Sequence, residues 1–392
     1  MSDRKYKPGK HFLQLPGPSN VPDRILNAMC YPTIDHRGPE FSELALKCLS
    51  GIKTIFKTKN PVIIFPASGT GAWEAALVNT LNDGDNVLMV ETGHFASLWN
   101  NMAQKLGLKV ELLKTDWRQG LDPNEIEKRL RLDADKKIKA VCIVHNETST
   151  GCTSDVKAVR EILDNLNHDA LLMVDTISGL ASINYEHDEW GVDITISGSQ
   201  KGLMLPPGLS FNAISEKAIN ASKKSTLKKS YWDWDEHLEF NRTGFFPYTP
   251  ATNLLFGLKE AIEMLHEEGL TNVFKRHARY SKATRIAVNA WGLEVYCQNE
   301  KRFSDVLTAV LVPENKDADQ LRKIILENFN MSLGNGLSKL KGKVFRIGHL
   351  GDFNDISLLG ILSGVEMGLD LMQIPIKEAG VEKAREYLKE NL

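Results

Sequence analysis

Three short polar segments could carry chemistry, and each follows an apolar run of the sequence. The first, residues 66–74, reads Pro-Ala-Ser-Gly-Thr-Gly-Ala-Trp-Glu and places two glycines and two hydroxyls at the expected start of a helix. Backbone N–H groups and the helix dipole attract an anion there, and Ser68 and Thr70 can add hydrogen bonds, so the segment could bind a phosphate. It lacks the third glycine of a dinucleotide fingerprint and the Gly-Lys-Ser/Thr of a Walker A loop. Alone, it could equally be an ordinary turn between a strand and a helix.

The other two segments each supply one charged side chain. Asp175 follows the apolar run 171–174, and Lys201 lies in Ser-Gly-Ser-Gln-Lys-Gly, directly after the run 194–196. A lone carboxylate at a strand end is usually a helix cap, and a lone lysine is usually solvated. Together with the first segment they match what pyridoxal phosphate requires: a lysine for the Schiff base, a carboxylate that keeps the pyridine nitrogen protonated, and a cradle for the phosphate. The three segments jointly predict a site for this cofactor.

A parallel sheet would bring these segments together. Apolar runs that alternate with helical patterns occupy residues 62–65, 86–90, 109–113, 141–144, 171–174 and 194–196. Such alternation, with strands apolar on both faces, predicts a mainly parallel sheet covered by helices. Ligands of these sheets bind at the carboxyl ends of the strands, where the three polar segments lie.

The rest of the chain divides into three expected parts. The first twenty residues are rich in proline and glycine, which indicates an extended arm. A helical stretch over residues 253–291, broken at Gly269, precedes a remainder with few strands and at least two helices. We therefore expect an arm (1–20), a large cofactor-binding domain (21–275) and a smaller α+β domain (276–392).

Composition restricts the possible functions. The chain has 392 residues, of which 42% are hydrophobic and 25% charged, as in ordinary globular proteins. The net charge of −2 shows no basic excess, and the lysine clusters at 136–139 and 223–229 are interpreted as solvated faces, so we expect no nucleic-acid partner. No apolar run is long enough for a membrane span, and no apolar region follows the charged residues 1–7 as in a secretory leader.

Other chemistries lack their motifs. The five cysteines are scattered without a C-x-x-C pair, which indicates reduced thiols and a cytoplasmic location. The ten histidines form no H-x-x-x-H pair, so we expect no metal site, and no G-x-S-x-G elbow suggests a serine hydrolase.

The sequence resembles the class V, fold-type I aminotransferases, and among them the serine–glyoxylate and alanine–glyoxylate enzymes. The resemblance covers nearly the whole chain and is carried by residues 15–18, 35–37, 69–74, 145–148, 188–193, 197–201, 248–250 and 343–351. It implies a large domain with a mainly parallel seven-stranded sheet and a smaller α+β carboxyl-terminal domain. It also implies a homodimer, or a tetramer built of dimers, with active sites at the subunit interface.

The resemblance assigns roles residue by residue. Lys201 would form the Schiff base, Asp175 would pair with the pyridinium, and Arg346 would bind the substrate α-carboxylate. The phosphate would contact Ser68, Gly69, Thr70 and Gln200; the ring would contact Phe95, Thr148 and Ile177. Some relatives place a tyrosine of the neighbouring subunit on the phosphate; that position is Phe246 here, and Tyr248 or Thr249 could replace it. The segment 35–37 could reach the mouth of the site or merely tie down the arm.

The implied reaction moves an amino group from a small L-amino acid to glyoxylate, giving glycine and a 2-oxo acid. Serine is the expected donor, with alanine or aspartate as alternatives. Two other readings remain: a desulfurase-like relative, for which Cys297 is the only cysteine after Lys201, and a cofactor-binding regulator without turnover.

Overall fold

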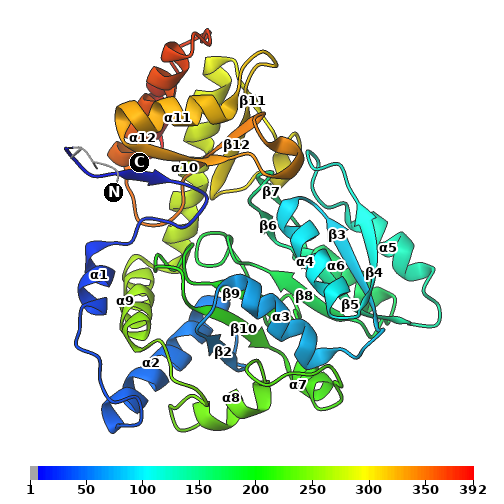
Figure 1. Cartoon of the computed structure of the whole chain (residues 1–392). Helices are drawn as coiled ribbons and strands as arrows, with labels where there is room; N and C mark the ends of the chain where they lie inside the picture. Colours follow the sequence, from blue (N-terminus) through cyan, green and yellow to red (C-terminus); the bar gives the residue numbers. More distant parts are fainter. Residues whose placement is uncertain (1–7) are drawn as a thin grey trace.

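The computed structural model describes residues 8–392, and its larger part is built on a seven-stranded sheet (Figure 1). Residues 1–7, on which the expectation of no secretory leader rests, lie outside the described residues. Four neighbouring strand pairs are parallel, and only β10 runs against both of its neighbours. The order across the sheet is β2 (Val62–Phe65), β10 (Ser210–Ile214), β9 (Ile194–Gly198), β8 (Leu171–Asp175), β5 (Ile138–Val144), β3 (Asn86–Glu91) and β4 (Lys109–Lys114). The predicted mainly parallel sheet is confirmed.

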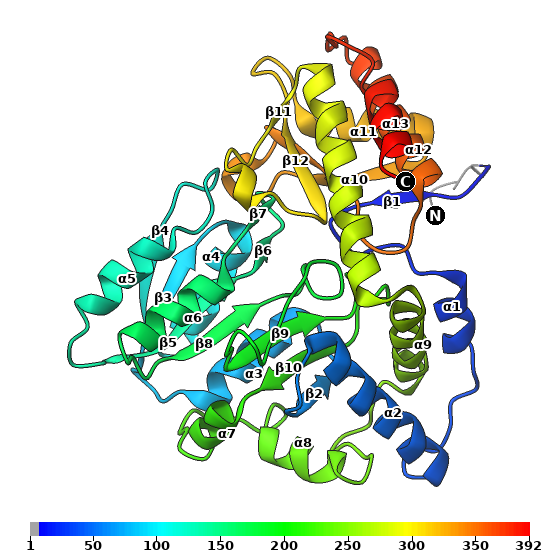
Figure 2. The same cartoon turned by 180° about the vertical axis from the view of Figure 1, so that it is seen from behind.

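Helices cover both faces of this sheet (Figures 1 and 2). Val62 and Ile64 of β2 pack into one hydrophobic core, while Ile63 and Phe65 pack into another, because successive side chains of a strand point to opposite faces. The first core includes α2 (Pro39–Phe56), α5 (Pro123–Arg131), α6 (Val156–Asn165) and α9 (Thr252–Glu268), with α1 (Asp23–Met29) against α9. The second includes α3 (Gly69–Thr80), α4 (His94–Lys105), α7 (Glu216–Ser222) and α8 (Trp234–Asn241).

The smaller part holds a five-stranded sheet with its own hydrophobic core. Its strands, in order, are β1 (Phe12–Gln14), β13 (Met331–Asn335), β14 (Val344–Gly348), β12 (Leu307–Leu311) and β11 (Glu294–Val295). Its helices are α11 (Ala318–Phe329), α12 (Asp355–Leu371) and α13 (Gly380–Glu390), with short 3₁₀ turns at Glu300–Arg302 and Ser338–Leu340. The sequence predicted few strands here, because strands of two to five residues give a weak periodic signal.

The amino-terminal arm belongs to this smaller sheet. Its strand β1 pairs in parallel with β13, so a segment expected to be merely extended forms the edge of the small sheet. A long helix, α10 (Leu270–Trp291), runs from the large part into the small one (Figure 2). Val273 packs in the large core, and the side chains from Tyr280 onward pack in the small one. The expected domain boundary at residue 275 falls inside this continuous helix and remains a prediction.

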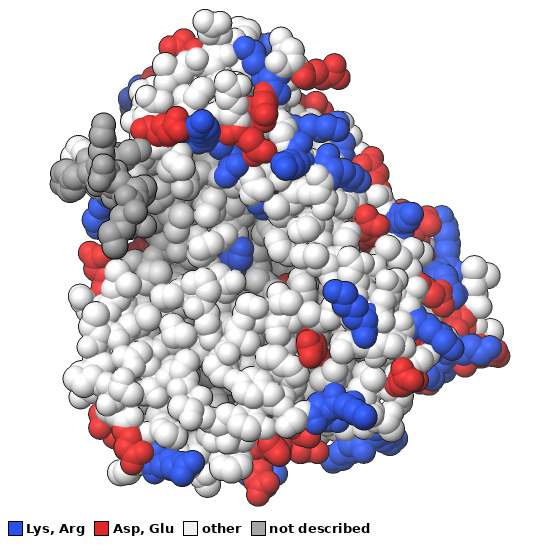
Figure 3. All heavy atoms as spheres, viewed as in Figure 1, with Lys and Arg blue, Asp and Glu red and all other residues white. Residues whose placement is uncertain are grey.

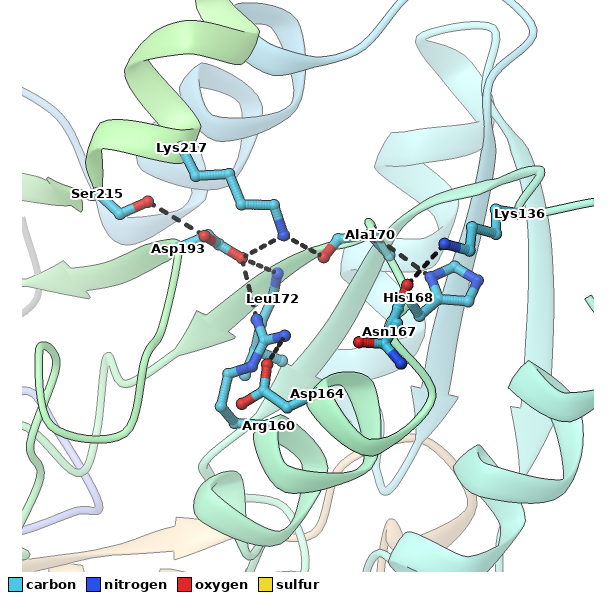
Figure 4. Close-up of polar contacts among 10 residues, drawn as sticks. All are labelled: Lys136, Arg160, Asp164, Asn167, His168, Ala170, Leu172, Asp193, Ser215 and Lys217. Carbon is cyan, nitrogen blue, oxygen red and sulfur yellow. Dashed lines mark hydrogen bonds and ion pairs between the residues drawn. The ribbon is translucent and has the colours of Figure 1, made fainter.

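The amino ends of β8 and β9 are fastened by Asp193, a residue of the 188–193 segment (Figure 4). Its carboxylate accepts the Leu172 backbone N–H at 2.8 Å and the Ser215 hydroxyl at 3.1 Å. Lys217 and Arg160 supply positive charge at 3.5 and 3.6 Å. This network secures the end of the sheet opposite to the one that carries the polar segments.

None of the helices formed by residues 8–392 combines the length and apolar character that crossing a membrane requires. Within the same residues, no group of three or more His, Cys, Asp or Glu side chains is placed to hold a metal ion.

Candidate active site

The carboxyl ends of β2, β5, β8 and β9 surround one cavity. Its walls combine the loop after β2, the end of β5 with the following hairpin, the end of β8, the loop after β9, and the first turn of α4. The lining residues are Ser68, Gly69, Thr70, Trp73, Phe95, Val144, Asn146, Thr148, Asp175, Ile177, Ser178, Gln200 and Lys201. Figure 3 shows the surface hollowed between the two parts of the molecule, with Lys or Arg atoms visible inside the hollow.

The structure brings together every residue that the sequence assigned to the cofactor except Thr249. That threonine lines a surface groove together with His36, Arg37, Phe246 and Tyr248. Among the described residues, His36 and Arg37 line this groove and not the cavity that contains Lys201, and both roles considered for residues 35–37 remain predictions. The expectation that Thr249 binds the cofactor therefore depends on a neighbouring subunit.

Asp175 ends β8 as a deeply buried carboxylate. Its Oδ1 accepts the Ile177 backbone N–H at 2.7 Å, and its Oδ2 accepts Trp73 Nε1–H at 3.0 Å. Burial raises the pKa of Asp175 to about 7, and the two hydrogen bonds and Lys201 oppose that rise only in part. Because this carboxylate is largely removed from solvent and lines the cavity, its negative charge would be stabilised most by a cation placed there.

Lys201 lies beneath the amino-terminal arm. Its Nζ donates a hydrogen bond to the Pro16 carbonyl oxygen, and Ser19 Oγ donates to the Lys201 carbonyl at 2.9 Å. Gly17 has a φ of +103°, which favours glycine, and a Cβ there would lie 2.2 Å from the lysine side chain and displace it. Burial lowers the pKa of Lys201 to about 8, with the positive charge of Arg346 acting in the same direction. The amine is thus poised to gain and lose a proton near neutral pH.

Arg346 reaches the site from β14 of the smaller part. Its Nε donates to the Asn335 carbonyl at 2.7 Å and its Nη1 donates to the Thr148 carbonyl at 2.8 Å, which ties the two parts of the molecule together. The residue is 7% exposed, and burial lowers its pKa to about 10, so the guanidinium stays charged at neutral pH. A guanidinium has five N–H donors, and these two bonds leave others for an anion.

Sequence reasoning missed three polar residues that line the cavity: Trp73, Asn146 and Ser178. Trp73 and Asn146 lie inside the segments 69–74 and 145–148 that carry the family resemblance. A tryptophan or an asparagine alone, however, does not indicate which residue it will hydrogen-bond. Asn146 Nδ2 donates to Ser178 Oγ at 2.7 Å, and that hydroxyl donates back to the Asn146 carbonyl at 2.8 Å. These contacts fix the loop after β5 to the loop after β8, and only the fold reveals them.

Comparison with known proteins identifies the family. The Aminotransferase class-V family matches residues 12–337. A serine–glyoxylate aminotransferase of Methylorubrum extorquens is 46% identical, with 98% of both chains covered. The chain belongs to the class V aminotransferases.

One further sequence relative and one solved structure are similar to nearly the whole chain. An L-aspartate–glyoxylate aminotransferase of Paracoccus denitrificans is 41% identical, with 96% of both chains covered. The crystal structure of ureidoglycine–glyoxylate aminotransferase from Bacillus subtilis superposes with a TM-score of 0.91 at 26% identity, covering 98% of this chain and 100% of the other. The predicted fold-type I architecture is confirmed, and the desulfurase-like reading is not supported because Cys297 is buried and lies outside the cavity lining.

The cavity fits pyridoxal phosphate, the cofactor of class V aminotransferases. Two amide oxygens in its lining, those of Asn146 and Gln200, are buried and have no hydrogen-bond partner among the described residues, as expected where a polar ligand supplies one. Ser68 precedes α3 but makes no capping hydrogen bond to it, so its hydroxyl remains available beside the helix amino terminus, where a phosphate is favoured. The buried Asp175 carboxylate suits a protonated pyridine nitrogen.

Proposed function

We propose that this aminotransferase moves the amino group of serine to glyoxylate, giving hydroxypyruvate and glycine. The observation that carries the proposal is that Lys201 and Asp175 line one cavity, while Arg346 is bonded to the carbonyl of Thr148, another lining residue, and its charge acts on Lys201. Serine is preferred over aspartate as donor because the serine–glyoxylate relative is the more similar of the two, at 46% against 41% identity.

The cavity residues divide into those that would hold the cofactor and those that would act on the substrate. Lys201 would hold it covalently and Asp175 would pair with its ring nitrogen. Phe95 and Ile177 would pack against the ring, and Thr148 would lie near the ring oxygen. The phosphate would be bound by Ser68, Gly69, Thr70 and Gln200. When bound, pyridoxal phosphate acts as an electron sink for the negative charge that develops at the substrate Cα.

Lys201 would carry the proton. A free lysine amine has a pKa of about 10.4 and is mostly protonated at neutral pH. Burial and the nearby Arg346 lower the pKa of Lys201 to about 8, so a useful fraction of the amine can accept the Cα proton at Nζ. The Pro16 carbonyl oxygen accepts a hydrogen bond from the same nitrogen and would orient it whenever it is released from the cofactor.

Replacing Arg346 with alanine is expected to reduce kcat/KM for serine and for glyoxylate alike. Both substrates present a carboxylate, and losing a charge-assisted pair costs about 2–4 kcal/mol, or roughly 30- to 1000-fold. Cofactor binding should hardly change, because Arg346 is absent from the cavity lining. Rapid-mixing measurements of the two half-reactions separately would check this.

Arg346→Lys is the matched control, since it keeps the charge but loses the planar fork that binds a carboxylate with two hydrogen bonds. We expect it to fall between wild type and Arg346→Ala. A loss confined to one substrate, or a loss of cofactor in place of activity, would show that Arg346 is not the shared carboxylate anchor.

The donor is tested by offering serine, alanine and aspartate in turn with glyoxylate fixed. We expect the highest kcat/KM with serine. A preference for aspartate would move the enzyme to the specificity of its Paracoccus relative, and no change in the visible spectrum with any donor would favour the regulator without turnover.

Trp73→Phe is expected to weaken cofactor binding by roughly 2- to 12-fold, the equivalent of one hydrogen bond of about 0.5–1.5 kcal/mol. The indole N–H donates to Asp175 and lowers its pKa, so without it the carboxylate is harder to ionise. Equilibrium titration of the apoenzyme with pyridoxal phosphate measures the effect, which should shrink at higher pH as Asp175 ionises regardless.

The matched control is Trp99→Phe. Trp99 stacks on Trp73 with ring centroids 5.9 Å apart, but its own buried N–H has no hydrogen-bond partner in the part of the chain that the structure describes. Both variants lose the same atoms from the same cluster, so equal weakening in both would mean that packing, and not the bond to Asp175, is responsible.

The site would be completed by a second copy of the chain in a cytoplasmic homodimer. Support comes from the face below the hollow in Figure 3, which is largely uncharged over a wide area. The groove with Thr249, Phe246 and Tyr248 also lies outside the cavity of its own chain. Sedimentation analysis tests the dimer; a monomer with full activity would remove any role for Thr249 in binding the phosphate.

A further inference from the structure

A second buried carboxylate lies behind the cavity wall. Glu147 ends the short strand β6 (Asn146–Glu147), which pairs with β7 (Cys152–Thr153), and its side chain is fully buried. Its Oε1 accepts the Ser149 backbone N–H at 3.0 Å and the Ser149 hydroxyl at 2.6 Å. Its Oε2 accepts the backbone N–H groups of Phe95 and Ala96, each at 3.2 Å.

These contacts make Glu147 the cap of a helix far away in the sequence. The residue before α4 is Gly93, which has no side chain to cap it, and a Cβ at this position would lie 2.3 Å from Glu147 Cγ. The N–H groups of Phe95 and Ala96 therefore go to Glu147, and that of His94 goes to Ser149 Oγ at 2.9 Å. The backbone that carries the Phe95 ring into the cavity is fixed by this carboxylate.

The same loop also holds the substrate-binding arginine. Thr148, the next residue, accepts Arg346 Nη1 on its carbonyl oxygen at 2.8 Å. The negative charge of Glu147 acts on that guanidinium as well, raising the pKa of Arg346 against the effect of burial. One side chain thus connects the ring-stacking residue of the large part to the arginine of the small part.

We propose that Glu147 is a positioning residue that sets the Phe95 ring and the Arg346 guanidinium relative to each other. This role rests on the proposed function, because it would hold the cofactor ring and the substrate carboxylate in the relative positions that the reaction requires. A carboxylate is needed because all four of its partners donate. A glutamine at this position would face backbone N–H donors with its own NH₂ group whichever way its amide is flipped, because both oxygens of Glu147 accept such donors.

The test compares Glu147→Gln with Asp193→Asn, the matched loss of a buried carboxylate that also accepts a backbone N–H but lies at the opposite end of the strands (Figure 4). Three properties are measured: the dissociation constant of pyridoxal phosphate for the apoenzyme, the dissociation constant of an unreactive carboxylate such as isobutyrate for the holoenzyme by titration calorimetry, and kcat/KM for serine and glyoxylate. Thermal unfolding of each apoenzyme reports the structural cost.

We expect Glu147→Gln to weaken cofactor and isobutyrate binding by about tenfold each and to lower both kcat/KM values by roughly 30-fold or more, in line with one or two lost charge-assisted hydrogen bonds. Asp193→Asn should change each binding constant and each kcat/KM value by less than about twofold, even if it lowers the unfolding temperature by as much as Glu147→Gln does. Glu147→Asp, which keeps the charge, should recover part of the loss.

A purely structural role would be established if Glu147→Gln unfolded at a lower temperature but bound pyridoxal phosphate and isobutyrate as tightly as the wild type. If Glu147→Gln fails to fold, Ser149→Ala replaces it, because it removes one of the four bonds to Glu147 together with the His94 N–H bond at the same helix end, and it should shift the same properties in the same direction by a smaller factor. An unchanged Ser149→Ala would overturn the proposal. If the wild type fails to transaminate serine, the proposed function fails, while the two binding measurements still decide the role of Glu147.

Discussion

Lys201→Ala is expected to abolish transamination and the visible absorbance of the bound cofactor together. The substitution removes both the covalent attachment and the amine that moves the Cα proton, and general-base catalysis alone accounts for about 100- to 10,000-fold in rate. Borohydride reduction of the wild type followed by peptide mapping identifies the attached lysine.

Lys217→Ala serves as the control, because Lys217 lies at the opposite end of the sheet, beside Asp193. It should keep its colour and its turnover. The label should be found on Lys201; a label on any other lysine would overturn the assignment. The Lys201→Ala apoenzyme should still fold, because the lost side chain is a buried amine whose one hydrogen bond within residues 8–392 is to the Pro16 carbonyl.

Asp175→Asn is expected to retain the cofactor but lose turnover by about 100- to 10,000-fold, the range for breaking a buried ion pair. Asparagine cannot supply the charge that keeps the ring nitrogen protonated, so the electron sink is weakened. Steady-state turnover with serine and glyoxylate measures this, and near-wild-type turnover would remove Asp175 from the mechanism.

The raised pKa of Asp175 should make the stability of the wild-type apoenzyme depend on pH in a way that the variant lacks. The pKa of Asp175 is about 7 when folded and about 3.9 in an unfolded chain. Between these values the folded state holds a proton that the unfolded state has released, so wild-type stability falls as pH rises from about 4 to about 7. Asp175→Asn should lack that part of the pH dependence. Urea unfolding at pH 5 and pH 8 tests it, and an equal pH dependence in both proteins would contradict the raised pKa.

The large sheet and most of the cavity could be predicted because the relevant signals are local. Apolar runs mark strands that are buried on both faces, and Asp175 and Lys201 stand where such runs end. Parallel strands then bring their carboxyl ends together whatever the details of packing. The residues that were missed act through partners distant in the sequence. The partners of Trp73 and Glu147 are set by packing between α3, α4 and the strand ends, and no pattern of residue types encodes that.

The smaller part was harder to predict for the same reason. The strands β11 to β14 have two to five residues each, too few for a clear alternation. The domain boundary expected at residue 275 stays a prediction, and the core contacts of α10 pass from one part to the other along its length.

The pairing of β1 with β13 has a consequence for the order in which the protein is completed during synthesis. His11, beside β1, bonds Asn330, 319 positions along the chain, so the arm must wait for a segment that is synthesised much later. The large sheet can form around its own cores while synthesis continues, because its seven strands all lie before residue 215. The arm cannot settle over Lys201 until β13 exists. The nascent chain therefore presents Lys201 uncovered, and the arm can cover it only after β13 (Met331–Asn335) has been synthesised.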